Sequence, residues 1–171
     1  MLVLHLTRCL HHTRATRGSM PKHLIRISNF KSMSESSKHT KLAGEWLTVS
    51  HSNLEPMLEK LGAPFIIRKV APRAKPSQKI SFDGSKMYII TETGFMTKES
   101  VVLIDGTEFN DEMFQKPLVA TAVVNETGSI TLQGKIGSTD INILREVNDE
   151  DQMVLTINAG DVECVRKFSR K

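Results

Sequence analysis

Histidine, cysteine and aromatic residues are scarce through most of this 171-residue chain. All six histidines lie before residue 52, so the body of the chain offers none for general base catalysis or metal binding. The body has a single cysteine, Cys164, which cannot form an internal disulfide and fits a reducing compartment. We find no glycine-rich phosphate loop and no metal-ligand spacing. These absences argue against an enzyme, and against a bound metal or cofactor.

Positive charge is concentrated at the N-terminus. Residues 1–40 hold seven of the 23 basic and one of the 19 acidic residues, which leaves residues 41–171 slightly acidic. That body has no basic patch typical of nucleic-acid binding, so we expect no nucleic-acid partner. We interpret residues 1–40 as a disordered basic extension, dispensable or an artefact of the gene model, with a mitochondrial targeting segment as the alternative. With no apolar run of about 20 residues and no secretory signal, we expect a cytoplasmic protein.

One short helical stretch interrupts the body of the chain. Ser52 and Glu55 have the spacing of a capping box, which predicts a helix start. Apolar side chains then recur at helical spacing, at Leu54, Met57, Leu58 and Leu61. Gly62 ends this stretch and Pro64 opens a second short helical segment, so we expect two short helices joined by a tight turn.

The rest of residues 41–171 has the pattern of β-strands. Alternating runs such as 78–82, 86–93 and 98–104 are separated by turn signals at intervals of about ten residues. About ten short strands joined by hairpins predict an all-β fold, either an up-and-down antiparallel barrel or a sandwich. The low aromatic content, 5%, favours a barrel with a cavity over a solid core.

Two arginines occur among apolar residues on the C-terminal strands. Arg145 shares its face with Ile141, Ile143 and Val147, because successive strand side chains point to opposite faces. Arg166 shares its face with Val162, Cys164 and Phe168. An unpaired buried cation is expensive, and no acid lies on either face, so a ligand with a carboxylate is the best candidate partner. The alternatives are that Arg145 pairs with Glu146 or another acid, and that Arg166 bends out at the barrel mouth.

Six motifs in order carry a family resemblance. They are GEW (44–46), the stretch 58–77, TETGF (91–95), DGTEF (105–109), REV (145–147) and CVRKF (164–168). Together they resemble the intracellular lipid-binding proteins, especially the fatty-acid-binding proteins, over about 130 residues. The resemblance implies a ten-stranded antiparallel up-and-down β-barrel with a helix-turn-helix lid, formed by residues 41–171, and an internal lipid cavity.

The resemblance also implies a ligand and a site. In that family two arginines and a tyrosine bind the lipid carboxylate; Arg145 and Arg166 match the arginines, and Phe168 replaces the tyrosine and so lacks its hydroxyl. Residues 115–117 also depart from the pattern, since many members place an acid and an arginine there. We expect a monomeric carrier of long-chain fatty acids, with a retinoid carrier, or a barrel that has lost its ligand and acts through protein interactions, as alternatives.

The remaining candidate residues line the expected cavity and its entrance. Ile143, Leu155 and Ile157 are expected to contact the ligand, although ordinary core packing explains each of them equally well. The residues expected to line the entrance under the lid are Leu54, Met57, Leu58 and Phe95. A basic cluster of Lys60, Arg68 and Lys69 is either a solvated face or a contact with anionic membranes.

Overall fold

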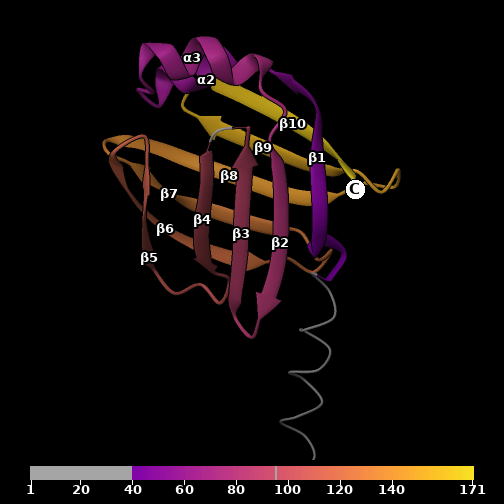
Figure 1. The fold of residues 1–171 in the computed structure, drawn as a ribbon. Coiled ribbons are helices and arrows are strands. Elements are labelled where there is room, and N and C mark those ends of the chain that lie inside the picture. The colour runs from indigo at the N-terminus through magenta and orange to yellow at the C-terminus, as the bar shows by residue number, and fades with distance from the viewer. Residues whose placement is uncertain (1–39, 95) are drawn as a thin grey trace, which may run out of the picture.

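The computed structural model describes residues 40–94 and 96–171. Ten antiparallel strands form one sheet in the order β4-β3-β2-β1-β10-β9-β8-β7-β6-β5, and the sheet curves into a nearly closed barrel (Figure 1). The strands are β1 (Gly44–Ser52), β2 (Ser77–Asp83), β3 (Lys86–Thr93), β4 (Met96–Leu103), β5 (Phe109–Met113), β6 (Lys116–Val124), β7 (Ile130–Ile136), β8 (Thr139–Val147), β9 (Met153–Ala159) and β10 (Val162–Arg170). The expected barrel is therefore confirmed.

The barrel has one seam, where β4 and β5 face each other. In the described part of the chain no backbone ladder joins these two edge strands. Lys98 on β4 reaches across instead: its ammonium donates to the backbone carbonyl of Glu112 and lies 3.6 Å from the Asp111 carboxylate on β5. A side-chain bridge thus replaces part of the missing ladder.

The two helices are α2 (Leu54–Lys60) and α3 (Phe65–Val70), and they cover one end of the barrel (Figure 1). The predicted capping box is wrong. Ser52 is the last residue of β1, and its hydroxyl accepts the Val165 N–H at 3.3 Å instead of capping the helix. The cap position is Asn53, whose backbone is left-handed (φ 52°) and whose amide donates to the Glu163 carbonyl on β10. The helix start is therefore set by a tertiary contact that local spacing does not reveal.

Two further contacts fasten α2 to the barrel. The Lys60 ammonium pairs with the Asp161 carboxylate at 2.7 Å, in the turn between β9 and β10. Lys116, at the start of β6, donates to the Leu61 carbonyl at 3.2 Å just after the helix ends. By contrast α3 has no buried residue and packs against α2 and the adjoining 3-10 turn η2 (Ala71–Arg73).

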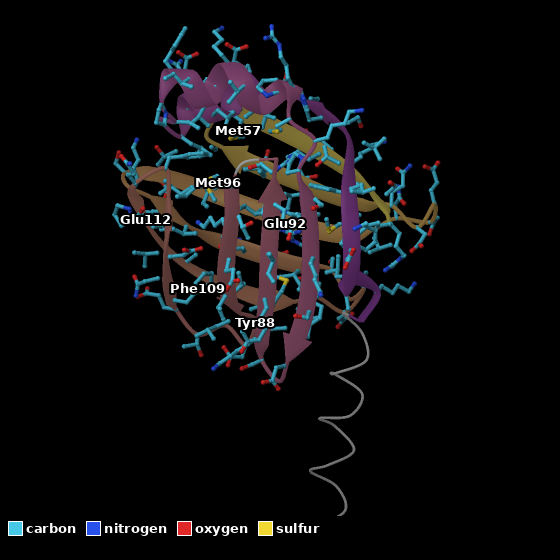
Figure 2. The ribbon with its side chains drawn as sticks, viewed as in Figure 1. Met57, Tyr88, Glu92, Met96, Phe109 and Glu112 are labelled. Carbon is cyan, nitrogen blue, oxygen red and sulfur yellow. The ribbon has the colours of Figure 1, made fainter. Side chains whose placement is uncertain are left out.

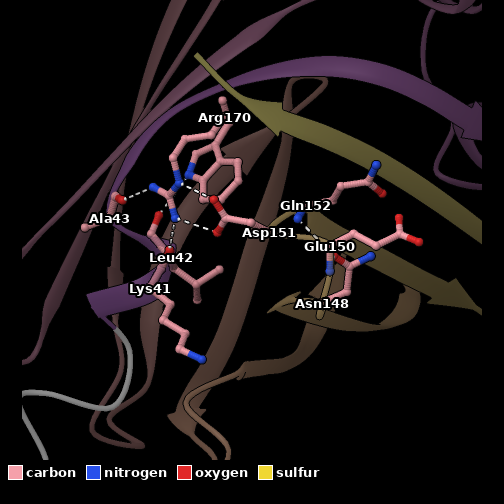
Figure 3. A network of polar contacts seen from close by, with 9 residues as sticks. Lys41, Leu42, Ala43, Asn148, Glu150, Asp151, Gln152 and Arg170 are labelled. Atoms are coloured by element: carbon pink, nitrogen blue, oxygen red, sulfur yellow. Dashed lines mark hydrogen bonds and ion pairs between the residues drawn. The ribbon is translucent and has the colours of Figure 1, made fainter.

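A polar network holds the two ends of the described domain together (Figure 3). Arg170, at the end of β10, donates to the carbonyls of Lys41 and Ala43 and pairs with the Asp151 carboxylate at 3.1 Å. Its guanidinium also stacks on the Trp46 indole, 4.3 Å from the ring centroid. This network fixes η1 (Thr40–Leu42) at the barrel end away from the helices (Figure 1). The expected extension, residues 1–40, lies outside the described residues apart from Thr40.

Candidate polar site in the barrel

The two arginines lie in one cross-strand row on the inner face of the barrel. Leu155 on β9 is in register with Arg145 on β8 and with Arg166 on β10. The arginines are therefore two strand spacings apart, about 10 Å along the sheet. The next row carries Ile143 and Ile157, which are also in register with each other. The alternation of the sequence correctly predicts that these side chains share one face.

Arg145 is buried against neutral partners. Its side chain is 8% exposed, and its Nη1 donates to the Gln78 amide oxygen at 2.9 Å and to the Met153 sulfur at 3.4 Å. Burial, and then the nearby Arg166 charge, lower the pKa of Arg145 well below its ordinary value, to about 10. The group is still charged at pH 7, and no anion among the described residues compensates it.

Arg166 is still less well satisfied. Its Nη2 lies 3.5 Å from the Thr48 hydroxyl, a long hydrogen bond, and its buried Nε has no partner within residues 40–94 and 96–171. Its guanidinium carbon lies 5.1 Å from the centroid of the fully buried Phe168 ring. Burial lowers the pKa of Arg166, and burial raises that of the neighbouring Cys164 thiol, as expected of a small buried hydrophobe.

Both structural alternatives for these arginines are wrong. Neither forms an ion pair with Glu146 or with any other acid that the structure describes. Arg166 does not bend out at the mouth, because it stacks on Phe168 and its Nε is buried. The inner face therefore carries two cations with unused donor capacity. A carboxylate could accept from both, since two oxygens offer about four lone pairs.

Sequence reasoning missed two polar partners of the arginines, Gln78 and Thr48, and one polar residue in register with Arg166, His51. Gln78 is 6% exposed and shares one face of β2 with the buried Ile80. A polar residue on an apolar strand face is the same signal that identified the arginines. Thr48 on β1 is 7% exposed and donates its hydroxyl to the Pro76 carbonyl at 2.7 Å. The prediction that the body, residues 41–171, has no histidine is wrong, because His51 lies on β1 in register with Arg166. Its ring forms a hydrogen bond with the Pro72 carbonyl at 2.9 Å.

The candidate entrance residues separate into two groups. Leu54, Met57 and Leu58 are buried on the face of α2 that meets the barrel, and Figure 2 places Met57 between the helices and the strands. Phe95 lies outside the described residues. The inner face of α2 thus matches its predicted periodicity.

The basic cluster on the helices is neutralised by acids. Each of its three cations has a carboxylate partner: Lys60 pairs with Asp161, Arg68 with Glu59 and Lys69 with Glu55. Beside these pairs α3 exposes apolar side chains; Phe65 is 63% and Ile66 72% exposed. The outer face of the lid is therefore apolar with balanced charge, and not a free basic patch.

Outside the barrel interior, the described residues form no second site comparable to the pair of arginines. A shallow depression of about 450 Å³ on the outer face of β7, β8 and β9 is lined by Gln133, Asp140, Asn142 and Asn158, among others, and contains neither arginine. Within residues 40–94 and 96–171, no three His, Cys, Asp or Glu side chains gather closely enough to hold a metal ion. In the same part of the chain, no helix has the length and apolar character needed to cross a membrane.

Comparisons with known proteins agree with this architecture. Sodium/calcium exchanger regulatory protein 1 of Doryteuthis pealeii is 33% identical over 129 residues, covering 75% of this chain and 96% of that protein. Human fatty acid-binding protein 9 is 35% identical over 128 residues, covering 74% of this chain and 95% of that protein. The chain belongs to the intracellular lipid-binding protein family. Another member, mouse cellular retinoic acid-binding protein 2, is 30% identical over 137 residues, covering 75% and 97% of the two chains.

A solved structure of the same family matches the whole barrel. The REP1-NXSQ fatty acid transporter superposes with a TM-score of 0.71 at 30% identity, covering 77% of this chain and 97% of that one. No family model matches the chain. The relatives and the solved structure confirm the family that the six motifs suggest.

Proposed function

We propose that this family member reversibly binds a long-chain fatty acid inside the barrel and catalyses no reaction. The observation that carries the proposal is the pair of inward-facing arginines, which no acid among the described residues neutralises. The fatty-acid carboxylate would accept hydrogen bonds from Arg145 and Arg166. Its chain would extend along Ile143, Leu155 and Ile157 and leave beneath α2. Phe168, which lacks a hydroxyl, would pack against the headgroup region without donating to it.

The acyl chain provides most of the affinity in this proposal. Burying one methylene is worth about 0.8 kcal/mol, so some sixteen methylenes would contribute at most about 13 kcal/mol. Association costs of order 4–15 kcal/mol oppose this gain. A charge-assisted hydrogen bond adds about 1.5–3 kcal/mol. The arginines therefore mainly select a carboxylate and set its orientation.

A fluorescent-probe displacement titration of the delipidated chain tests the proposal. Oleate should displace the probe saturably, one molecule per chain, at micromolar or tighter affinity. Arg166→Ala should weaken oleate binding about tenfold or more, because a charge-assisted hydrogen bond is lost, while oleyl alcohol should bind both forms alike. Equal losses for acid and alcohol would show that Arg166 acts only in packing.

Retinoic acid is the second candidate ligand. The retinoic acid-binding relative and the same pair of arginines support it, because retinoic acid also joins an apolar body to a carboxylate. The same titration distinguishes the two ligands. A folded protein from which neither acid displaces the probe would instead support a barrel that acts through protein interactions.

We further propose that lipid exchange takes place at membranes through the lid, in a cytoplasmic monomer. The exposed Phe65 and Ile66 on α3 support contact with a lipid surface. The ion pairs of Lys60, Arg68 and Lys69 reduce the expected contribution of charge. Ile66→Ser should therefore slow transfer of a fluorescent fatty acid to vesicles more than added salt does. A rate unchanged by Ile66→Ser would contradict this role of α3.

A further inference from the structure

Gln78 links Arg145 to Thr91 by hydrogen bonds inside the barrel. Its strand, β2, is separated from β8 in the sheet by β1, β10 and β9, so Arg145 meets it across the interior. The Gln78 amide oxygen accepts from Arg145 Nη1 at 2.9 Å, and its amide nitrogen donates to the Thr91 hydroxyl on β3 at 3.2 Å. Both ends of the amide are therefore engaged, and the oxygen is held toward the arginine.

A neutral amide satisfies a donor without neutralising its charge. Arg145 keeps a full positive charge, and the second cation, Arg166, lies in the same cross-strand row. A glutamate has nearly the same size as a glutamine and would present a carboxylate oxygen at the same point. The residue at position 78 thus decides whether the barrel provides its own anion or leaves that role to the ligand.

We propose that Gln78 is a specificity-determining residue: by holding Arg145 through a neutral oxygen, it makes the site require an anionic headgroup. This inference rests on the proposed function. When the ligand arrives, its carboxylate takes the place of the Gln78 oxygen as acceptor of Arg145 Nη1. The displaced amide keeps its hydrogen bond to Thr91.

Two substitutions separate the charge of residue 78 from its packing. Gln78→Glu supplies an internal carboxylate, which competes with the ligand for Arg145. Gln78→Met keeps the length of the side chain but removes the acceptor. The matched control is Gln133→Glu, the same chemical change on the exposed outer face of β7, which alters net charge equally.

The experiment is a displacement titration of the full chain and its three variants with oleate and with oleyl alcohol, after circular dichroism has verified folding. Gln78→Glu should weaken oleate binding about tenfold or more and change alcohol binding by less than about threefold. Gln78→Met should bind oleate several-fold more tightly than the unmodified chain, because no internal acceptor has to be displaced. Gln133→Glu should change neither affinity.

The outcomes are distinct. Unchanged oleate affinity in Gln78→Glu, or equal losses for oleate and alcohol, would overturn the inference while leaving the proposed function intact. If Gln78→Glu does not fold, Gln78→Met decides, and an unchanged or weaker oleate affinity in that variant would overturn the inference. An unmodified chain that binds no oleate would overturn both the function and the inference before any variant is compared.

Discussion

Replacing Arg145 with methionine should make the empty protein more stable, although the side chain is well buried and hydrogen-bonded. The folded pKa of Arg145, about 10, lies well below the pKa of an arginine in the unfolded chain. The unfolded chain therefore binds more protons between these two values, and the penalty for holding the charge is fully present at pH 7. At 1.36 kcal/mol per pH unit, the penalty is about 3 kcal/mol.

Part of that gain is lost again in the variant. Methionine leaves the Gln78 amide oxygen without its donor, which costs about 1–2 kcal/mol. The net expectation is a free energy of unfolding about 1–2 kcal/mol larger than that of the unmodified chain. Urea unfolding of both delipidated proteins, followed by Trp46 fluorescence, measures this difference.

An exposed arginine provides the matched control. Arg170→Met removes the ion pair to Asp151, two backbone hydrogen bonds and the stack on Trp46, so it should destabilise the chain by about 1–3 kcal/mol. Opposite signs for the same chemical change would support the reasoning. A destabilised Arg145→Met protein with unchanged unfolding slope would refute it, because the guanidinium would then be a net structural contact.

Three further predictions follow from single contacts. Phe168→Tyr should tighten oleate binding several-fold in the same titration if a hydroxyl at this buried position reaches the carboxylate, and unchanged affinity would contradict that geometry. Gly134→Ala should lower the free energy of unfolding by about 1–3 kcal/mol, since its Cβ would lie 2.3 Å from the Val119 carbonyl oxygen; a neutral effect in urea would contradict this close approach. Deleting residues 1–40 should leave the free energy of unfolding and the oleate affinity unchanged. Deleting residues 1–43 should lower the free energy of unfolding, because it removes the carbonyls that accept hydrogen bonds from Arg170 and Trp46. Equal losses of stability in the two deletions would contradict this boundary.

The barrel was predictable from the sequence because its signals are repetitive. About ten short strands with alternating side chains are predicted, separated by turn residues, and the predicted strand at 86–93 coincides with β3 (Lys86–Thr93). The start of α2 was not predictable in the same way. Ser52 and Glu55 have the spacing of a capping box, yet pairing with β10 draws the Ser52 hydroxyl to the Val165 N–H. A strand pairing of high sequence separation here outweighs a local preference.

The candidate site was predictable only in part, for a related reason. Alternation identifies which residues face inward, and it correctly placed Arg145 and Arg166 on one side. It does not tell which residue of a distant strand an inward side chain meets. The contact of Arg145 with Gln78 joins positions 67 residues apart across the barrel. The sequence around either residue therefore gives no sign of its partner.

The buried arginines and the arginine at the end of β10 differ in how well their charges are satisfied. At the end of the barrel away from the helices, Arg170 meets a carboxylate, two carbonyls and an aromatic face, so its charge is well satisfied and stabilises the domain. Inside the barrel, Arg145 and Arg166 meet a neutral amide, a thioether and a distant hydroxyl, so their charges are left incompletely satisfied. A chain under selection for stability alone would gain by replacing such a pair with apolar residues. An anionic ligand that binds both arginines would explain why the two cations are kept. The cost of burying their charges lowers the stability of the empty barrel, and hydrogen bonds to the bound anion would offset that cost.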